Sequence, residues 1–320
     1  MRYNTVKRGL AALLLFATVL LAILGLSSCK EQNDDELHIV VTMFPIYDWV
    51  SRILDINPSN VKLSMLMDSG KDVHSYQATV DDIATISSCD MIIYVGGESD
   101  AWVEDAIENS RNDDMVVIKL LDVVGLCYGD TCEGEDSHHD HSGDDEHIWL
   151  SVKYAIRICE YLRDRIIELD EGERDVYSSA AEKYCAELSV LDEEYEAAKA
   201  SANKEALVFA DRFPFIYLLA DYGIEYYAAF DGCSSESDAS FETVAALAGI
   251  VDELDISVVL IIDGSDGKLA NTVIANTKNA DQSIERLNSM QSVSKGDIES
   301  GVTYISIMRS NLESIKRALA

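Results

Sequence analysis

The chain has 320 residues, of which 25 are Lys or Arg and 58 are Asp or Glu, so its formal net charge at pH 7 is −33. This balance excludes nucleic acid as a partner, because phosphate binding needs clustered Lys and Arg. It is compatible with attracting cations, although charge alone defines no site. The length suits two modest domains with a real core, so disulfides are not needed to hold the fold.

The first 28 residues have the pattern of a targeting segment. Cations near the start precede an apolar run over residues 9–26, which ends in Leu-Ser-Ser-Cys at Cys29. This order is typical of a bacterial lipoprotein signal, which is cut before the cysteine that carries lipid. We predict a signal peptide over 1–28, lipidation of Cys29, a tether over 29–36 and a location outside the cytoplasm, anchored by lipid to the cell membrane. A plain secretory signal or a short membrane anchor is the alternative.

Residues 37–150 alternate β-like runs with helical runs, which predicts an α/β lobe with a mostly parallel sheet covered on both faces. Thr79 and Asp82 have the spacing of a capping box at the start of a short helix. The predicted strands are 37–43, 61–65, 91–95 and 116–120, and the predicted helices lie at 45–55, after 79 and at 101–108.

The pattern then changes twice. Residues 133–147 form an acidic, histidine-rich loop. Just before it, Cys127 and Cys132 flank four loop residues and could form a local disulfide outside the cytoplasm. Residues 151–200 have a helical apolar period with a break near 170–173, which predicts a connecting helix, or two helices nearly end to end. Alternation resumes over 201–320, with strands at 206–210, 225–229 and 257–262 and helices from 214, at 241–254, 268–277 and 303–319. The predicted fold is α/β, with two lobes joined by a long rigid helix.

Two histidines lie where α/β folds place their ligands. His74 follows the second predicted strand, and His147 lies beyond the fourth, at the end of the acidic loop. Ligands bind at the carboxyl ends of parallel strands, so both should face a cleft between lobes. Imidazoles beside carboxylates bind first-row metals. The chain is therefore predicted to bind metal, and the loop histidines are candidates for further weak sites: His138, His139 and His141.

Five segments carry motifs that are specific in this order: residues 41–48, 73–83, 90–97, 147–150 and 215–224. Together they resemble the zinc- and manganese-binding solute-binding lipoproteins of bacterial ABC transporters, a zinc-uptake and adhesin-like family. The resemblance implies two α/β lobes with metal held between them, an ABC transporter permease as partner, a monomer and no enzymatic activity. Its first two metal histidines fall on His74 and His147.

The second lobe departs from the family pattern. The position of the third ligand is Arg212, and a guanidinium cannot bind a metal ion. We expect Arg212 to form an ion pair with Asp211 or with an acid of the facing lobe. Cys233 and Gln291 are the candidates to complete the site, although Cys233 could equally be a small buried residue in a turn. Other possible oxygen donors are Asp211, Asp231 and Glu236.

Two imidazoles and a thiolate favour zinc, whereas an oxygen-rich site would favour manganese. The predicted function is capture of zinc, or alternatively manganese, and its delivery to the permease. Two further alternatives are a metal chelate whose carboxylate meets Arg212, and a lipid-anchored metalloenzyme. The sequence has no HExxH or GxSxG motif to support the enzyme.

Overall fold

A computed structural model describes residues 36–55, 60–128, 145–230, 232–233 and 239–320, without the side chains of 126–128. Several predicted features lie outside these residues: the signal peptide, Cys29 and nearly all of the tether, most of the acidic loop with His138, His139 and His141, and the proposed Cys127–Cys132 disulfide.

The N-terminal lobe is built on a parallel sheet in the order β2-β1-β3-β4. All four predicted strands are present, as β1 (Leu37–Val41), β2 (Val61–Met65), β3 (Met91–Tyr94) and β4 (Val116–Lys119). The accompanying helices are α2 (Phe44–Ile53), α3 (Val80–Ile86), α4 (Trp102–Glu108) and α5 (Leu120–Tyr128). The capping box of Thr79 and Asp82 is confirmed at the start of α3. Helix α5 was missed because it begins directly at the end of β4, without a polar turn to mark it.

The C-terminal lobe repeats this topology, with a parallel sheet in the order β6-β5-β7-β8. Its strands are β5 (Ala206–Phe209), β6 (Glu225–Ala228), β7 (Val258–Ile262) and β8 (Ser283–Leu287). Its helices are α8 (Ile216–Asp221), α9 (Phe241–Glu253), α10 (Lys268–Ala275), α11 (Lys295–Glu299) and α12 (Tyr304–Ala318). Strand β8 was missed because it is an edge strand whose charged residues Glu285 and Arg286 interrupt the apolar pattern.

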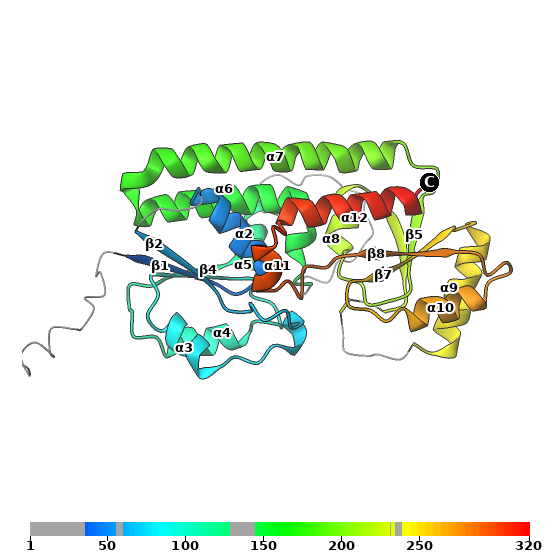
Figure 1. The fold of residues 1–320 in the computed structure, drawn as a ribbon, viewed down its shortest axis with the longest axis horizontal. Coiled ribbons are helices and arrows are strands. Elements are labelled where there is room, and N and C mark those ends of the chain that lie inside the picture. The colour runs from blue at the N-terminus through cyan, green and yellow to red at the C-terminus, as the bar shows by residue number, and fades with distance from the viewer. Residues whose placement is uncertain (1–35, 56–59, 129–144, 231, 234–238) are drawn as a thin grey trace, which may run out of the picture. The chain divides into compact units, whose positions relative to one another are not determined.

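The connector consists of two helices, α6 (Val152–Leu169) and α7 (Arg174–Ala200), with a short turn between them. The predicted break near 170–173 is confirmed. The two helices pack side by side, so the prediction that residues 151–200 form one helix, or two helices end to end, is wrong (Figure 1). Each helix has an apolar stripe, and packing the two together covers both stripes. Helix α7 also joins the lobes: the Tyr184 hydroxyl donates to Asp48 of α2 at 3.0 Å, and the Tyr195 hydroxyl to the carbonyl of Met308 in α12 at 2.7 Å.

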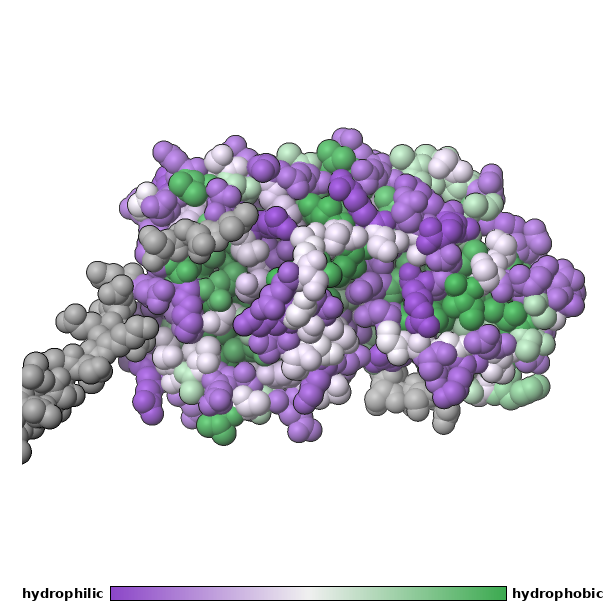
Figure 2. Space-filling model, in the orientation of Figure 1, coloured by the Kyte–Doolittle hydropathy of each residue, from purple (hydrophilic) through white to green (hydrophobic). Residues whose placement is uncertain are grey.

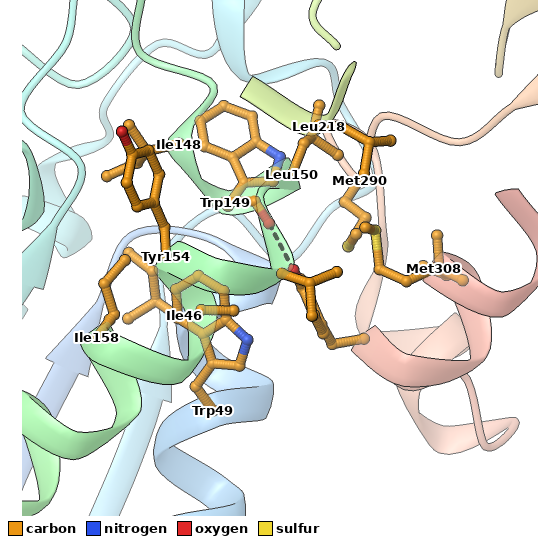
Figure 3. Close-up of a cluster of buried hydrophobic side chains, with 14 of the residues drawn as sticks. Ile46, Trp49, Ile148, Trp149, Leu150, Tyr154, Ile158, Leu218, Met290 and Met308 are labelled. Carbon is orange, nitrogen blue, oxygen red and sulfur yellow. Dashed lines mark hydrogen bonds between the residues drawn. The ribbon is translucent and has the colours of Figure 1, made fainter. Parts of the chain in front are cut away.

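One hydrophobic cluster continues from the N-terminal lobe into the C-terminal lobe (Figure 3). Trp49 of α2 lies edge-on to Tyr304 of α12, with ring centroids 5.3 Å apart. The Tyr304 hydroxyl donates to the carbonyl of Trp149, 2.8 Å away, in the short helix η3 (Ile148–Leu150). Met290 and Met308 complete the same cluster. Tyr304 therefore ties η3 to α12, which matters because His147 immediately precedes η3.

The surface agrees with the acidic composition. On the face drawn in Figure 2, hydrophilic residues cover most of the surface and hydrophobic ones appear between them. Within the described ranges, no helix has the length and apolar character needed to cross a membrane.

Candidate metal centre

The two predicted histidines meet at the carboxyl edge of the N-terminal sheet. His74 lies in η2 (Val73–Ser75), and the Asp72 carboxylate accepts its backbone N–H. The His147 residue is almost fully buried, with 3% of its surface exposed, whereas 22% of the His74 side chain is exposed. Their Nε2 atoms are 3.2 Å apart. One ion could therefore contact both nitrogens and reach them from the His74 side.

Cys233 and Gln291 of the C-terminal lobe reach the same point. Cys233 follows β6 and Gln291 follows β8, so both come from the carboxyl edge of the second sheet. The amide nitrogen of Gln291 lies 2.9 Å and 2.8 Å from the two histidine Nε2 atoms and 3.5 Å from Sγ of Cys233. The ligand atoms of His74, His147 and Cys233 all lie within 4.8 Å of one another. The structure thus brings together the two predicted histidines and the two candidates to complete their site, Cys233 and Gln291.

The spacing of these atoms fits a tetrahedral zinc site. Zinc bonds of about 2.0 Å to nitrogen and about 2.3 Å to sulfur place neighbouring nitrogen donors about 3.3 Å apart in a tetrahedron. The two histidine nitrogens are 3.2 Å apart, and the Gln291 amide group stands at a further corner. The residues therefore offer two nitrogens, one sulfur and, when the amide presents its oxygen, one oxygen.

Carboxylates from the acidic loop orient both rings. Oδ1 of Asp145 lies 3.0 Å from Nδ1 of His147. Oε1 of Glu146 lies 3.2 Å from Nδ1 of His74, and the Ser99 hydroxyl is 2.8 Å from the same nitrogen. Such partners keep a proton on Nδ1, so each ring turns Nε2 toward the centre.

Glu146 is itself fixed by the loop after β3. Its carboxylate accepts the backbone N–H of Ser99 at 2.9 Å and also the Ser99 hydroxyl. A side chain at Gly97 would overlap Glu146, so the close approach of this loop requires glycine. The acidic pair before His147 is visible in the sequence. The contact of Glu146 with His74, and the part played by Ser99, depend on the loop after β3 and were missed.

The four groups shift one another's pKa. Burial lowers the pKa of both histidines, but contacts with Cys233 and with the orienting carboxylates outweigh it, so that His74 rises to about 10 and His147 to about 9. Burial raises the pKa of Cys233, yet His147 and His74 bring it down to about 7. Burial likewise raises the pKa of Glu146, but His74 and Ser99 lower it to about 2. The protonated imidazoles and the Cys233 thiolate thus stabilise each other. A metal cation that displaces the imidazole protons could bind this thiolate.

Arg212 forms an ion pair that bridges the lobes. Its Nη2 atom lies 3.0 Å from Oδ2 of Asp72 in the N-terminal lobe. The other oxygen of Asp72 accepts the backbone N–H of His74 at 3.0 Å. The expected ion pair with an acid of the facing lobe is present, and it braces the loop that carries His74. Asp211 instead accepts the backbone N–H of Arg212.

Donors from two α/β lobes that meet at one point define a two-lobed metal-binding protein. Residues 39–318 match the family model described as zinc-uptake complex component A, periplasmic, and the chain belongs to this family. The zinc-binding lipoprotein AdcA of Streptococcus pneumoniae is 28% identical over 308 residues, which cover 95% of this chain and 60% of AdcA. The chain thus spans only about three-fifths of the length of that relative.

In two further comparisons, the match extends over all or nearly all of the related protein. The high-affinity zinc uptake system protein ZnuA of Bacillus subtilis is 27% identical over 313 residues, 94% of each chain. The solved structure of the metal-dependent lipoprotein YcdH of Bacillus subtilis superposes with a TM-score of 0.73 at 24% identity, covering 89% of this chain and 100% of that one. The predicted family and the predicted two-lobe α/β fold are confirmed.

Proposed function

We propose that this protein captures one zinc ion outside the cytoplasm and delivers it to the permease of an ABC transporter. The observation that carries the proposal is the meeting of His74, His147, Cys233 and Gln291 within the dimensions of a tetrahedral site. Membership of the zinc-uptake family supports the same conclusion. Each lobe supplies two of the donors, so separation of the lobes would split the site and release the ion.

The donor set favours zinc over the alternatives. Manganese prefers carboxylate, carbonyl and water oxygens, whereas this cluster offers two imidazoles and a thiolate. A metal chelate would need a free guanidinium, but Arg212 is already paired with Asp72. A catalytic zinc keeps a coordination position open for water, and four protein donors would fill that position. Capture and release therefore fit the site better than catalysis does.

The direct test is zinc analysis of the mature protein after stripping and reloading. We expect one tightly bound zinc per chain and weaker binding of further ions by the histidine-rich loop. Deletion of residues 133–144 should remove the weak sites and leave the tight site, because Asp145, Glu146 and His147 remain. Loss of tight binding in the deletion variant would place the site in the loop and end the two-lobe proposal.

Zinc affinity should rise with pH through the neutral range. Protons on His74 and His147 compete with zinc, and both pKa values are raised, to about 10 and about 9. Fewer protons remain to be displaced as pH rises, so affinity increases by about tenfold per pH unit for each proton released. We expect at least about a tenfold gain between pH 6.5 and 7.5, measured by competition with a chelator of known pH dependence. An affinity that does not change over this range would show that no imidazole proton is displaced.

We infer that Cys29 carries the membrane anchor of the mature protein. The order of cations, apolar run and Ser-Ser-Cys supports this. Cys29→Ala should move the protein from the membrane fraction to the soluble fraction or to an uncleaved precursor of higher mass. Because a single acyl chain binds only marginally, stable attachment of the unchanged protein implies more than one chain. A cleaved variant that stays in the membrane pellet would contradict the lipid anchor.

A further inference from the structure

Behind the Gln291 amide lies a hydrogen-bonded pair, Ser289 and Asp263, which follow β8 and β7 respectively. The Ser289 hydroxyl is 2.8 Å from Oδ1 of Asp263 and 3.2 Å from Oε1 of Gln291. The same carboxylate oxygen accepts the backbone N–H of Ser289 at 2.6 Å. Both Ser289 and Gln291 are buried, with 1% and 2% of their surface exposed. Bulk water therefore does not reach the Gln291 amide. The end of the amide that faces away from the histidines has Ser289 as its hydrogen-bond partner.

A serine hydroxyl has a single proton and cannot donate to both neighbours. The Asp263 carboxylate is closer than the amide oxygen, and a charged acceptor forms the stronger bond. Once the proton is directed to Asp263, Ser289 turns lone pairs toward Gln291. Lone pairs call for an N–H donor, which is the nitrogen end of the amide. The Ser289–Asp263 pair thus favours the orientation in which the amide nitrogen of Gln291 faces Ser289 and the amide oxygen faces the histidines.

In the structure the amide nitrogen faces the two Nε2 atoms, whose lone pairs become available to a metal ion once their protons are displaced. A metal ion takes up those lone pairs, and the N–H groups would then point at a cation. Rotation of the amide by half a turn exchanges its two ends, which occupy nearly the same positions. After rotation the oxygen faces the ion and the nitrogen donates to Ser289.

We propose that Ser289, with its proton held by Asp263, is a positioning residue that turns the Gln291 amide oxygen toward the bound metal. In the loaded protein Ser289 then accepts the amide N–H of Gln291. This inference rests on the proposed metal site and adds how a neutral amide can serve as its fourth donor. It explains how the site works with glutamine where a carboxylate would need no orientation.

The test is a double-mutant cycle read out by zinc competition with a chelator. Ser289→Ala should weaken zinc binding by about tenfold, the lower end for loss of an outer hydrogen-bond partner of a metal ligand. In the Gln291→Glu background, Ser289→Ala should cost no more than about twofold, because both carboxylate oxygens are alike and no end has to be chosen. Ser314→Ala, which removes a buried hydroxyl of the same lobe that bonds Glu285, is the control and should leave affinity unchanged.

An equal loss in both backgrounds would mean that Ser289 acts only through folding, and no loss in either would mean that the amide orients without it. Each result overturns the inference while leaving the proposed function standing, because the unchanged protein still binds zinc. Failure of the unchanged protein to bind zinc would remove both. The side-chain amide resonance of Gln291 gives a second readout: zinc should shift it in the unchanged protein, and Ser289→Ala should reduce that shift.

Discussion

Replacing His147 with alanine should weaken zinc binding by at least about a hundredfold. Loss of a partner that merely orients a ligand costs about ten- to a hundredfold in affinity, so loss of the ligand itself should cost at least as much. His147 places its Nε2 in the cluster from a buried position, and its ring packs against Trp149 with centroids 5.0 Å apart. Water cannot readily take its place there. Isothermal titration with zinc, after stripping with a chelator, measures the effect.

His74→Ala separates ligand loss from damage to the fold. The His74 residue lies at the exposed side of the centre, so its removal leaves the core unchanged, and affinity should again fall by at least about a hundredfold. His38→Ala is the matched control, because His38 lies in β1 with its ring bonded to Ser64 at 2.9 Å, outside the cluster. The control should bind zinc as the unchanged protein does. Normal affinity in His74→Ala, or an equal loss in the control, would remove the histidine site.

The fold could be predicted where residues follow a simple period. Buried parallel strands such as 91–95 are continuous apolar runs, and the capping pattern at Thr79 marks a helix start without tertiary information. Strand β8 could not be predicted, because its stability comes from pairing with β7 rather than from its own composition. The side-by-side packing of α6 and α7 also depends on which apolar stripes meet, and the period of one helix does not specify its partner.

Some residues of the candidate site could likewise be predicted from the sequence, and others could not. His74 and His147 could be identified because each lies in a short motif at a strand end. Arg212 could be excluded as a ligand by chemistry alone, since its guanidinium keeps its proton. Its partner Asp72 could not be named, because the two residues are 140 positions apart in the chain and meet only when the lobes meet. The orienting contact between Glu146 and His74 has the same origin.

Cys233 should be the residue that gives the site its preference for zinc. Its sulfur belongs to the cluster with both imidazoles, and its pKa is lowered to about 7, so a thiolate is readily available for a metal. Thiolates favour zinc, whereas manganese favours oxygen donors. Cys233→Ser replaces an anionic sulfur with a neutral hydroxyl of similar shape. We expect zinc affinity to fall by at least about a hundredfold and manganese affinity to change by less than about tenfold. The ratio of zinc affinity to manganese affinity should therefore decrease.

Alkylation of the unchanged protein tests the same role without a substitution. A zinc-bound thiolate is deprotonated but shielded by the ion, so Cys233 should resist iodoacetamide when zinc is present and react once zinc is removed. Cys185, which is partly exposed on α7 and lies outside the cluster, is the internal control. Its reactivity should be the same with and without zinc, and Cys185→Ser should retain full zinc affinity. If peptide mapping finds equal modification of Cys233 in both states, the thiolate is not a ligand, and the preference for zinc must then come from the two imidazoles alone.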